Sequence, residues 1–141
     1  MRSRQAFLAL VLAGGLAAGG VHAQSAEQAP QAQAVIDQQI KAFRQGAHDQ
    51  AFSYAAPTLQ QIFRTTDNFT AMVKRGYMPI YGARAWRFGR AKAQGRRLFQ
   101  EVMLTGPNGR SWVALYTMVK GPDGEWRIGG VRIVPGNDVA T

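Results

Sequence analysis

The feature that most constrains the fold is a turn sequence that occurs twice, as Gly106-Pro107-Asn108-Gly109 and as Gly121-Pro122-Asp123-Gly124. Proline presets the backbone at the first turn position, Asn or Asp tolerates the second, and the closing glycine accepts a left-handed conformation. Each turn separates two runs in which apolar and other residues alternate. Two such turns in succession predict consecutive antiparallel hairpins.

The alternating runs predict about four strands in the second half of the chain. They lie around 86–88 and over 98–104, 111–120 and 126–134. The run 111–120 is apolar on both faces, which is typical of a central strand. Gly129-Gly130 inside the last run predicts a bulge or bend that curls the sheet.

The first half of the chain has the apolar period of helices instead. Ala32, Ile36, Ile40 and Phe43 form one stripe that Gly46 ends, and shorter stripes follow up to residue 76. Helices followed by hairpins predict an α+β domain in which N-terminal helices pack on a curved, roughly four-stranded antiparallel sheet. We expect a flexible lead-in over 24–33, a single domain over 34–136 and a tail over 137–141.

The N-terminus has the pattern of a secretory signal peptide over residues 1–23. Two arginines precede a short apolar run, and Val21-His22-Ala23 has small residues where a signal peptidase reads. We therefore expect cleavage between Ala23 and Gln24 and an exported protein, periplasmic or secreted, that is soluble after cleavage. The alternative is an uncleaved anchor helix, although the run is short for a bilayer. Because the chain has no cysteine, it forms no disulfide and stability must come from burial.

Three segments together resemble a known family. They are residues 69–81 (FTAMVKRGYMPIY), 112–116 (WVALY) and 123–130 (DGEWRIGG). They are similar to a family of exported bacterial proteins called domain of unknown function 4864, in which a cysteine often occupies the position of Val131. The order of elements also resembles the cystatin-like cone fold of nuclear transport factor 2-like domains. This resemblance implies a fold with a pocket between helices and sheet, and it implies no activity.

Large aromatic residues gather where the helices and the sheet should meet. Cone folds can hold a small apolar ligand there, with tyrosine hydroxyls as oriented polar contacts, whereas the alternative is that the rings only fill the core. The ligand-pocket candidates are Tyr54, Phe63, Tyr77, Tyr81, Trp86, Trp112 and Tyr116.

The chain is strongly basic, with a formal net charge of +9. A dense basic stretch between Arg84 and Arg97 could attract an anionic ligand, anionic lipid or envelope polysaccharide; the alternative is a solvated face that aids solubility. The anion-binding candidates are Arg75, Arg84, Arg87, Arg90, Lys92, Arg96 and Arg97. No nucleic-acid-binding motif is present, so we expect no nucleic acid partner.

The residues offer little for catalysis. His48 is the one histidine after the signal segment, there is no cysteine, and acidic residues are scattered, so we expect neither a metal site nor a cofactor. The carboxylates nearest to the predicted pocket are Asp67, which suits a helix cap, and Glu101, which is out of phase with the buried positions of its strand. We therefore expect a non-enzymatic module that binds a small ligand or an envelope component. The alternatives are a cone-pocket hydrolase or isomerase, and a peripheral binder of anionic lipid or polysaccharide; a homodimer through the exposed sheet face is a further expectation.

Overall fold

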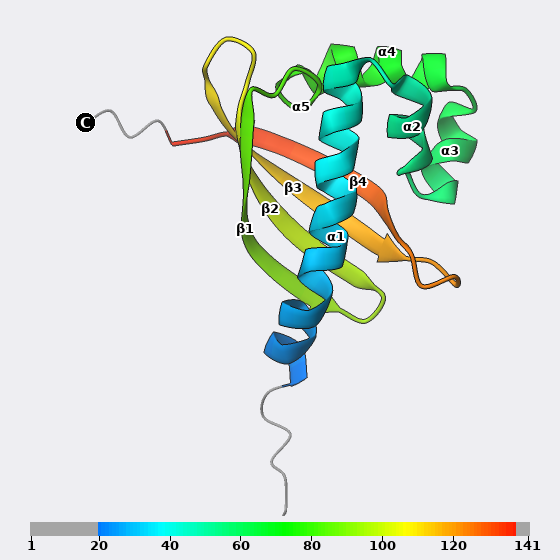
Figure 1. The fold of residues 1–141 in the computed structure, drawn as a ribbon, viewed down its shortest axis with the longest axis vertical. Helices are drawn as coiled ribbons and strands as arrows, with labels where there is room; N and C mark the ends of the chain where they lie inside the picture. The colour runs from blue at the N-terminus through cyan, green and yellow to red at the C-terminus, as the bar shows by residue number, and fades with distance from the viewer. Residues whose placement is uncertain (1–19, 138–141) are drawn as a thin grey trace, which may run out of the picture.

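The computed structural model describes residues 20–137, with side chains from residue 27 onward. Within these residues, five helices precede four strands. They are α1 (Gly20–Gln45), α2 (His48–Ser53), α3 (Pro57–Phe63), α4 (Thr66–Gly76), α5 (Met78–Tyr81), β1 (Ala85–Gln94), β2 (Arg97–Thr105), β3 (Ser111–Lys120) and β4 (Trp126–Pro135). The expected α+β class is therefore confirmed. In Figure 1, α1 lies across one face of the sheet, and α2 to α5 gather around the C-terminal half of α1.

The strands form one antiparallel sheet in the order β1-β2-β3-β4. The two repeated turns connect β2 to β3 and β3 to β4. In each, a glycine closes the turn with a positive φ, 82° at Gly109 and 80° at Gly124, which a glycine adopts without steric cost. The backbone N–H of Gly106 donates to the backbone carbonyl of Arg110, and that of Gly121 donates to the backbone carbonyl of Glu125, each at 2.8 Å. The predicted hairpins are confirmed, together with their turn chemistry.

Bulges bend both edge strands. The register between β3 and β4 shifts at Gly129, and the register between β1 and β2 shifts between Phe88 and Ala91. The first shift confirms the bend predicted from Gly129-Gly130. Next to it, the backbone N–H of Ala56 donates to the carbonyl of Ile128 at 2.8 Å, and the N–H of Ile128 donates to Tyr54 at 2.8 Å. The segment between α2 and α3 thus pairs with part of the outer edge of β4.

The core lies between α1 and the sheet face that it covers, which we call the inner face. Ile36 and Ile40 of α1 are fully buried, as are Leu98 and Val102 of β2 and Met118 of β3. Burial of such large apolar side chains contributes about 1.5–3 kcal/mol each. Polar contacts add to the packing, because the indole Nε1 of Trp86 on β1 donates to Asp37 of α1 at 3.0 Å.

The segment 24–33, which the sequence analysis expects to be a flexible lead-in, lies within α1. Ala32 is fully buried and Ala29 is 8% exposed, and the amide Nε2 of Gln33 donates to Gln100 Oε1 at 3.1 Å. The segment is polar and rich in Ala and Gln, so it lacks a strong apolar stripe. Its small alanines nevertheless allow a close approach to the sheet.

Two predicted segments fall partly outside the described residues. Most of the predicted signal peptide lies in residues 1–19, and the predicted tail extends into 138–141. The expected cleavage positions, Ala23 and Gln24, are within α1. Within residues 20–137, no helix combines the length and the apolarity needed to cross a membrane.

Candidate functional site

A cavity of about 210 Å³ lies between the helices and the inner face of the sheet. Its buried floor comes from α1, α4, β3 and β4, and its mouth from half-buried side chains of α3, α4 and β4. The lining residues are Gln39, Phe43, Ala55, Leu59, Phe63, Phe69, Met72, Val73, Tyr77, Ile80, Tyr116, Ile128, Gly130 and Val131.

Helix α4 supplies one wall because its apolar residues recur at helical spacing. Its N-cap Thr65 accepts a hydrogen bond from the backbone N–H of Asn68 at 3.1 Å, which satisfies one of the free amides of the first turn. Phe69 then stacks near Phe52, with ring centroids 5.0 Å apart, and near Phe43, at 6.0 Å. These contacts hold the α4 wall against α1 and α2.

The mouth of the cavity is bridged by a tyrosine. The hydroxyl of Tyr77, just after α4, donates to the backbone carbonyl of Val131 on β4 at 3.1 Å. Val131 follows the Gly129 bulge and lies opposite Tyr116 of β3. The bulge therefore determines which residue of β4 lines the mouth.

Tyr116 belongs to the lining of this mostly apolar cavity and carries a polar atom without a partner, although that hydroxyl oxygen is itself buried and does not open into the free volume. Its side chain is 1% exposed, and its hydroxyl has no hydrogen-bond partner. Burial raises the pKa of Tyr116 far above its usual value, so the hydroxyl stays neutral and can both donate and accept. Two other lining residues have polar side chains, and both are paired: Gln39 donates through Nε2 to the carbonyl of Ala51 at 3.0 Å, and the Tyr77 hydroxyl donates to the carbonyl of Val131.

An unpaired buried hydroxyl costs about 1–3 kcal/mol. Two other buried polar atoms in the described residues also lack partners, Thr70 Oγ1 and Trp126 Nε1, but neither residue lines the cavity. Among the described residues, Tyr116 is therefore the member of the cavity lining whose buried side chain has an unpaired polar atom.

The structure brings three of the seven aromatic candidates together and places four elsewhere. Phe63, Tyr77 and Tyr116 line the cavity. The Tyr54 hydroxyl donates to Gln38 at 2.9 Å, and the Tyr81 hydroxyl lies 2.9 Å from His48 Nε2.

The two tryptophans among these candidates also have partners away from the cavity. Trp86 donates to Asp37. Trp112 lies under the Arg110 guanidinium, whose carbon is 4.8 Å from the ring centroid.

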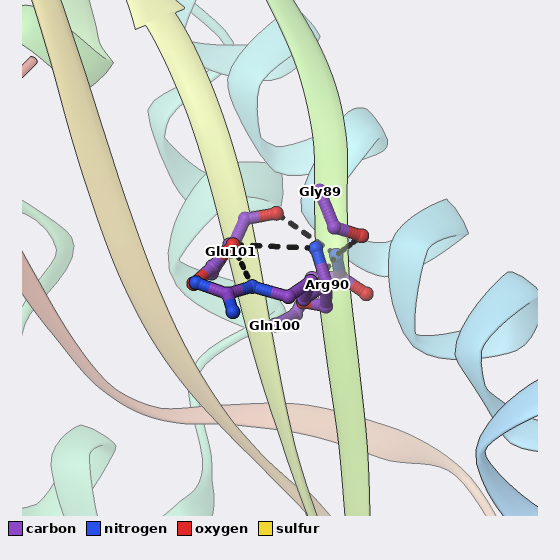
Figure 2. A network of polar contacts seen from close by, with 4 residues as sticks. All are labelled: Gly89, Arg90, Gln100 and Glu101. Atoms are coloured by element: carbon purple, nitrogen blue, oxygen red, sulfur yellow. Dashed lines mark hydrogen bonds and ion pairs between the residues drawn. The ribbon is translucent and has the colours of Figure 1, made fainter. Parts of the chain in front are cut away.

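The carboxylates considered for an enzyme lie away from the cavity. Glu101 points from β2 to the side opposite the core, where Arg90 on β1 binds it through Nη2 at 3.2 Å and Nε at 3.3 Å (Figure 2). These hydrogen bonds from Arg90 hold the pKa of Glu101 below its ordinary value of 4.5. Asp67 is exposed in the first turn of α4. Neither carboxylate is placed to act as a buried acid or base on a bound molecule.

The anion-binding candidates do not form one patch in space. Arg87, Arg90, Lys92 and Arg97 lie on the sheet face opposite α1, whereas Arg75 is on α4 and Arg84 precedes β1. Arg96, in the turn between β1 and β2, donates through Nε to the carbonyl of Lys120 at 3.1 Å and through Nη2 to Gly121. In the part of the chain that the structure describes, no three His, Asp or Glu side chains converge as metal ligands would.

Sequence reasoning missed most of the cavity lining. The missed residues are Gln39, Phe43, Ala55, Leu59, Phe69, Met72, Val73, Ile80, Ile128, Gly130 and Val131. The stripe Phe69, Met72 and Val73 was visible as a buried face, but periodicity does not say whether a buried face meets a core or a cavity.

Comparison with known proteins identifies a family. Searches of the curated proteins and of the solved structures found no match. The family model described as a domain of unknown function (DUF4864) matches residues 25–141, nearly the whole chain. The chain therefore belongs to this domain family of unknown function, as the three sequence segments indicated.

Proposed function

We propose that this protein is a non-enzymatic, exported binding module that holds a small amphiphilic molecule in its inner cavity. The observation that carries the proposal is a mostly apolar cavity whose lining includes Tyr116, a residue with an unpaired buried hydroxyl that a small side-chain movement would bring to a ligand. Ligand pockets typically combine apolar walls with a small number of placed polar groups that fix orientation. The neutral Tyr116 hydroxyl supplies that group here.

The size of the cavity limits the ligand class. A dry cavity of roughly 150 Å³ accepts benzene, and this one measures about 210 Å³. The best fit is a ring with a small polar substituent, or a short alkyl chain with a polar end. A bulkier ligand would need to extend through the mouth, past Tyr77 and Val131.

Export to the bacterial envelope is supported by the N-terminal sequence. The charged start, short apolar run and small residues before Gln24 form the pattern of a cleavable signal peptide. The family match begins at residue 25, next to the expected cleavage point. A ligand for this module would then be a molecule of the envelope.

The alternative of a hydrolase or isomerase is less well supported. The cavity lining contains no carboxylate, histidine or lysine, whereas turnover of this kind needs a positioned acid or base. A hydrogen-bonding tyrosine in an apolar cavity is a means of orientation rather than of proton transfer.

The test uses a matched pair of probes, p-cresol and toluene, which differ by one hydroxyl. Isothermal titration of the mature chain should show both binding, with p-cresol the tighter ligand. In Tyr116→Phe the affinity for p-cresol should fall by about two- to twelve-fold, the worth of about 0.5–1.5 kcal/mol for one hydrogen bond. The affinity for toluene should stay the same.

A second variant, Val131→Phe, places a ring at the mouth and should reduce binding of both probes. Thermal unfolding of each variant verifies that it is folded. Absence of binding of either probe by the wild-type chain would overturn the proposal. An equal effect of Tyr116→Phe on both probes would do the same, because the hydroxyl would then orient nothing.

A further inference from the structure

The sheet face opposite α1, here called the outer face, has an apolar centre. Residues directly opposite each other in neighbouring strands share a face, so the register assigns side chains to it. Met103, Val113 and Val134 form one row across β2, β3 and β4, and Glu101, Leu115 and Arg132 form the next. Phe99 and Val119 continue the apolar centre. Phe99 and Val134 are each 37% exposed, so large apolar side chains here contact water.

Cationic side chains surround this centre. They come from three strands and are Arg87, Arg90, Lys92, Arg97, Arg127 and Arg132. The Oδ2 atom of Asp123, in the turn before β4, lies 3.8 Å from Nη2 of Arg127. On the face itself the strands contribute one carboxylate, Glu101, which Arg90 already binds. The outer face therefore carries a strong excess of positive charge.

The outer face is also hollowed. A depression of about 920 Å³ is lined by Arg90, Lys92, Phe99, Leu115, Thr117 and Arg132, among others. The β1 bulge forms one side of it. There the Gln100 amide donates to the carbonyls of Gly89 and Arg90 while Glu101 accepts from the Arg90 N–H at 3.3 Å, so the bulge is held from both faces (Figure 2).

The apolar centre, the cationic rim and the depression of the outer face together favour one class of binding partner over others. A polysaccharide would leave the apolar centre unpaired, and a flat bilayer would not reach into a depression. A second copy would bring the same cations face to face, and like charges at an interface repel each other. An amphipathic helix fits, because its diameter of about 10 Å allows an apolar stripe to enter the depression while acidic side chains reach the cations. The same sheet already receives a helix, α1, on its inner face.

We propose that the outer face docks an acidic amphipathic helix of a partner protein. Apolar contacts to Phe99 and Leu115 would supply affinity, and the flanking Lys92 and Arg132 would select acidic partners and fix their orientation. This surface lies on the opposite side of the sheet from the inner cavity, although Tyr116, Gly130 and Val131 belong to the lining of both hollows.

The probe is a fluorescein-labelled peptide of about 18 residues, or five helical turns, with leucines on one face and glutamates on the other. Fluorescence anisotropy with the mature chain should show saturable binding that weakens as salt rises from about 50 to 500 mM. A peptide of the same composition, scrambled to remove the leucine stripe, should bind at least about tenfold more weakly.

Matched variants locate the contact. Lys92→Glu and Arg132→Glu should each weaken binding by about tenfold, because charge reversal replaces attraction with repulsion, whereas Arg75→Glu on α4 makes the same charge change away from the face and should have no effect. Phe99→Ser should weaken binding, and Ile62→Ser, which alters the 64%-exposed Ile62 of α3, should not. Circular dichroism verifies that each variant is folded.

Three outcomes would overturn the proposal. The first is equal loss of binding in Arg75→Glu and Lys92→Glu, which would indicate a general charge effect. The second is that the wild-type chain does not bind the peptide but binds phosphatidylglycerol vesicles, and that Phe99→Ser weakens the vesicle binding. This result would assign the face to anionic lipid. The third is a homodimer in sedimentation velocity that Phe99→Ser dissociates, which would assign the face to a second copy. Lys92→Glu alters a residue that lines the outer depression and not the inner cavity, so it should leave p-cresol binding unchanged, and failure here and failure of the cavity proposal are distinguishable.

Discussion

At the scale of single residues, the polar side chain of Gln100 is buried and hydrogen-bonds to several separate segments. Its side chain is 1% exposed. Its Nε2 lies within hydrogen-bond distance of the carbonyls of Gly89, Arg90 and Glu101, and its Oε1 accepts from Gln33 of α1. A buried polar residue is tolerated when such partners are present. Gln100 thus connects the β1 bulge to α1.

Replacing Gln100 tests this role. We expect Gln100→Leu to lower the free energy of unfolding by about 1–3 kcal/mol, because the bulge carbonyls and the Gln33 amide lose their partner. Gln33→Ala, at the half-buried end of the same contact, should cost less. Urea unfolding followed by tryptophan fluorescence measures both. A Gln100→Leu protein as stable as wild type would mean that the network contributes nothing.

At the scale of elements, α1 is the helix that organises the core. Its N-terminal part contacts the sheet through alanines, whose small size brings the helix close to the strands. Asp37 joins α1 to β1 through Trp86 and also pairs with Lys41 Nζ at 2.8 Å. Both packing and a polar contact thus hold α1 to the sheet.

The packing of the early part of α1 gives a matched pair of substitutions. Ala32 is fully buried and Ala34 is exposed. We expect Ala32→Leu to destabilise the protein by about 1–3 kcal/mol through overpacking, and Ala34→Leu to change stability by less than about 0.5 kcal/mol. Thermal unfolding compares the two. Equal stability of both variants would show that this part of α1 is not packed on the sheet.

The Asp37 contact makes a pH-dependent contribution. Burial raises the pKa of Asp37, but the hydrogen bonds from Lys41 and Trp86 outweigh burial, so the pKa lies below its ordinary value of 3.8. A carboxyl with a lowered folded-state pKa stabilises the fold above its unfolded pKa, and the contribution is lost as pH falls through the folded pKa.

We therefore expect Asp37→Asn to be less stable than wild type at neutral pH, and the difference to shrink below about pH 4. Urea unfolding at a series of pH values measures it. A constant difference across the series would attribute the loss to packing instead. Glu101→Gln is a parallel case, because hydrogen bonds from Arg90 lower the pKa of Glu101 as well.

At the scale of the whole molecule, one four-stranded sheet presents two different surfaces. The inner face carries the core and the cavity with the Tyr116 hydroxyl, and the outer face carries the cationic rim around Phe99. The proposed ligand and the proposed partner thus use opposite sides of the same sheet, and residues that line only one hollow, such as Phe63 for the cavity and Phe99 for the outer face, allow each to be tested by itself.

Export is the prediction for the molecule as a whole. Intact-mass measurement of protein recovered from the envelope fraction of its own cells should show a chain that begins at Gln24, because the residues before it form the signal pattern. Ala23→Arg should block this processing and serves as the control. Recovery of chains that still begin at Met1 would contradict cleavage after Ala23.

Local sequence patterns predicted much of the fold. The repeated Gly-Pro-Asn/Asp-Gly turns determine two hairpins by backbone geometry alone, and alternation determines which residues of β2 and β3 face the core. The helix around Phe69 and the bend at Gly129 were readable for the same reason. The early part of α1 was not, because Ala29 and Ala32 show their role only through the sheet that they approach.

The amino-acid sequence by itself determined the α+β class, the hairpin order and the basic character of the chain, because turn chemistry, periodicity and charge act between near neighbours. Only the tertiary structure decided which aromatic residues share a cavity, since Phe63, Tyr77 and Tyr116 meet through packing of helices on strands far apart in sequence. It also divided the basic residues, bringing Lys92 and Arg132 to one face and leaving Arg75 on α4. Sheet register and helix docking depend on long-range contacts, and no local pattern records them.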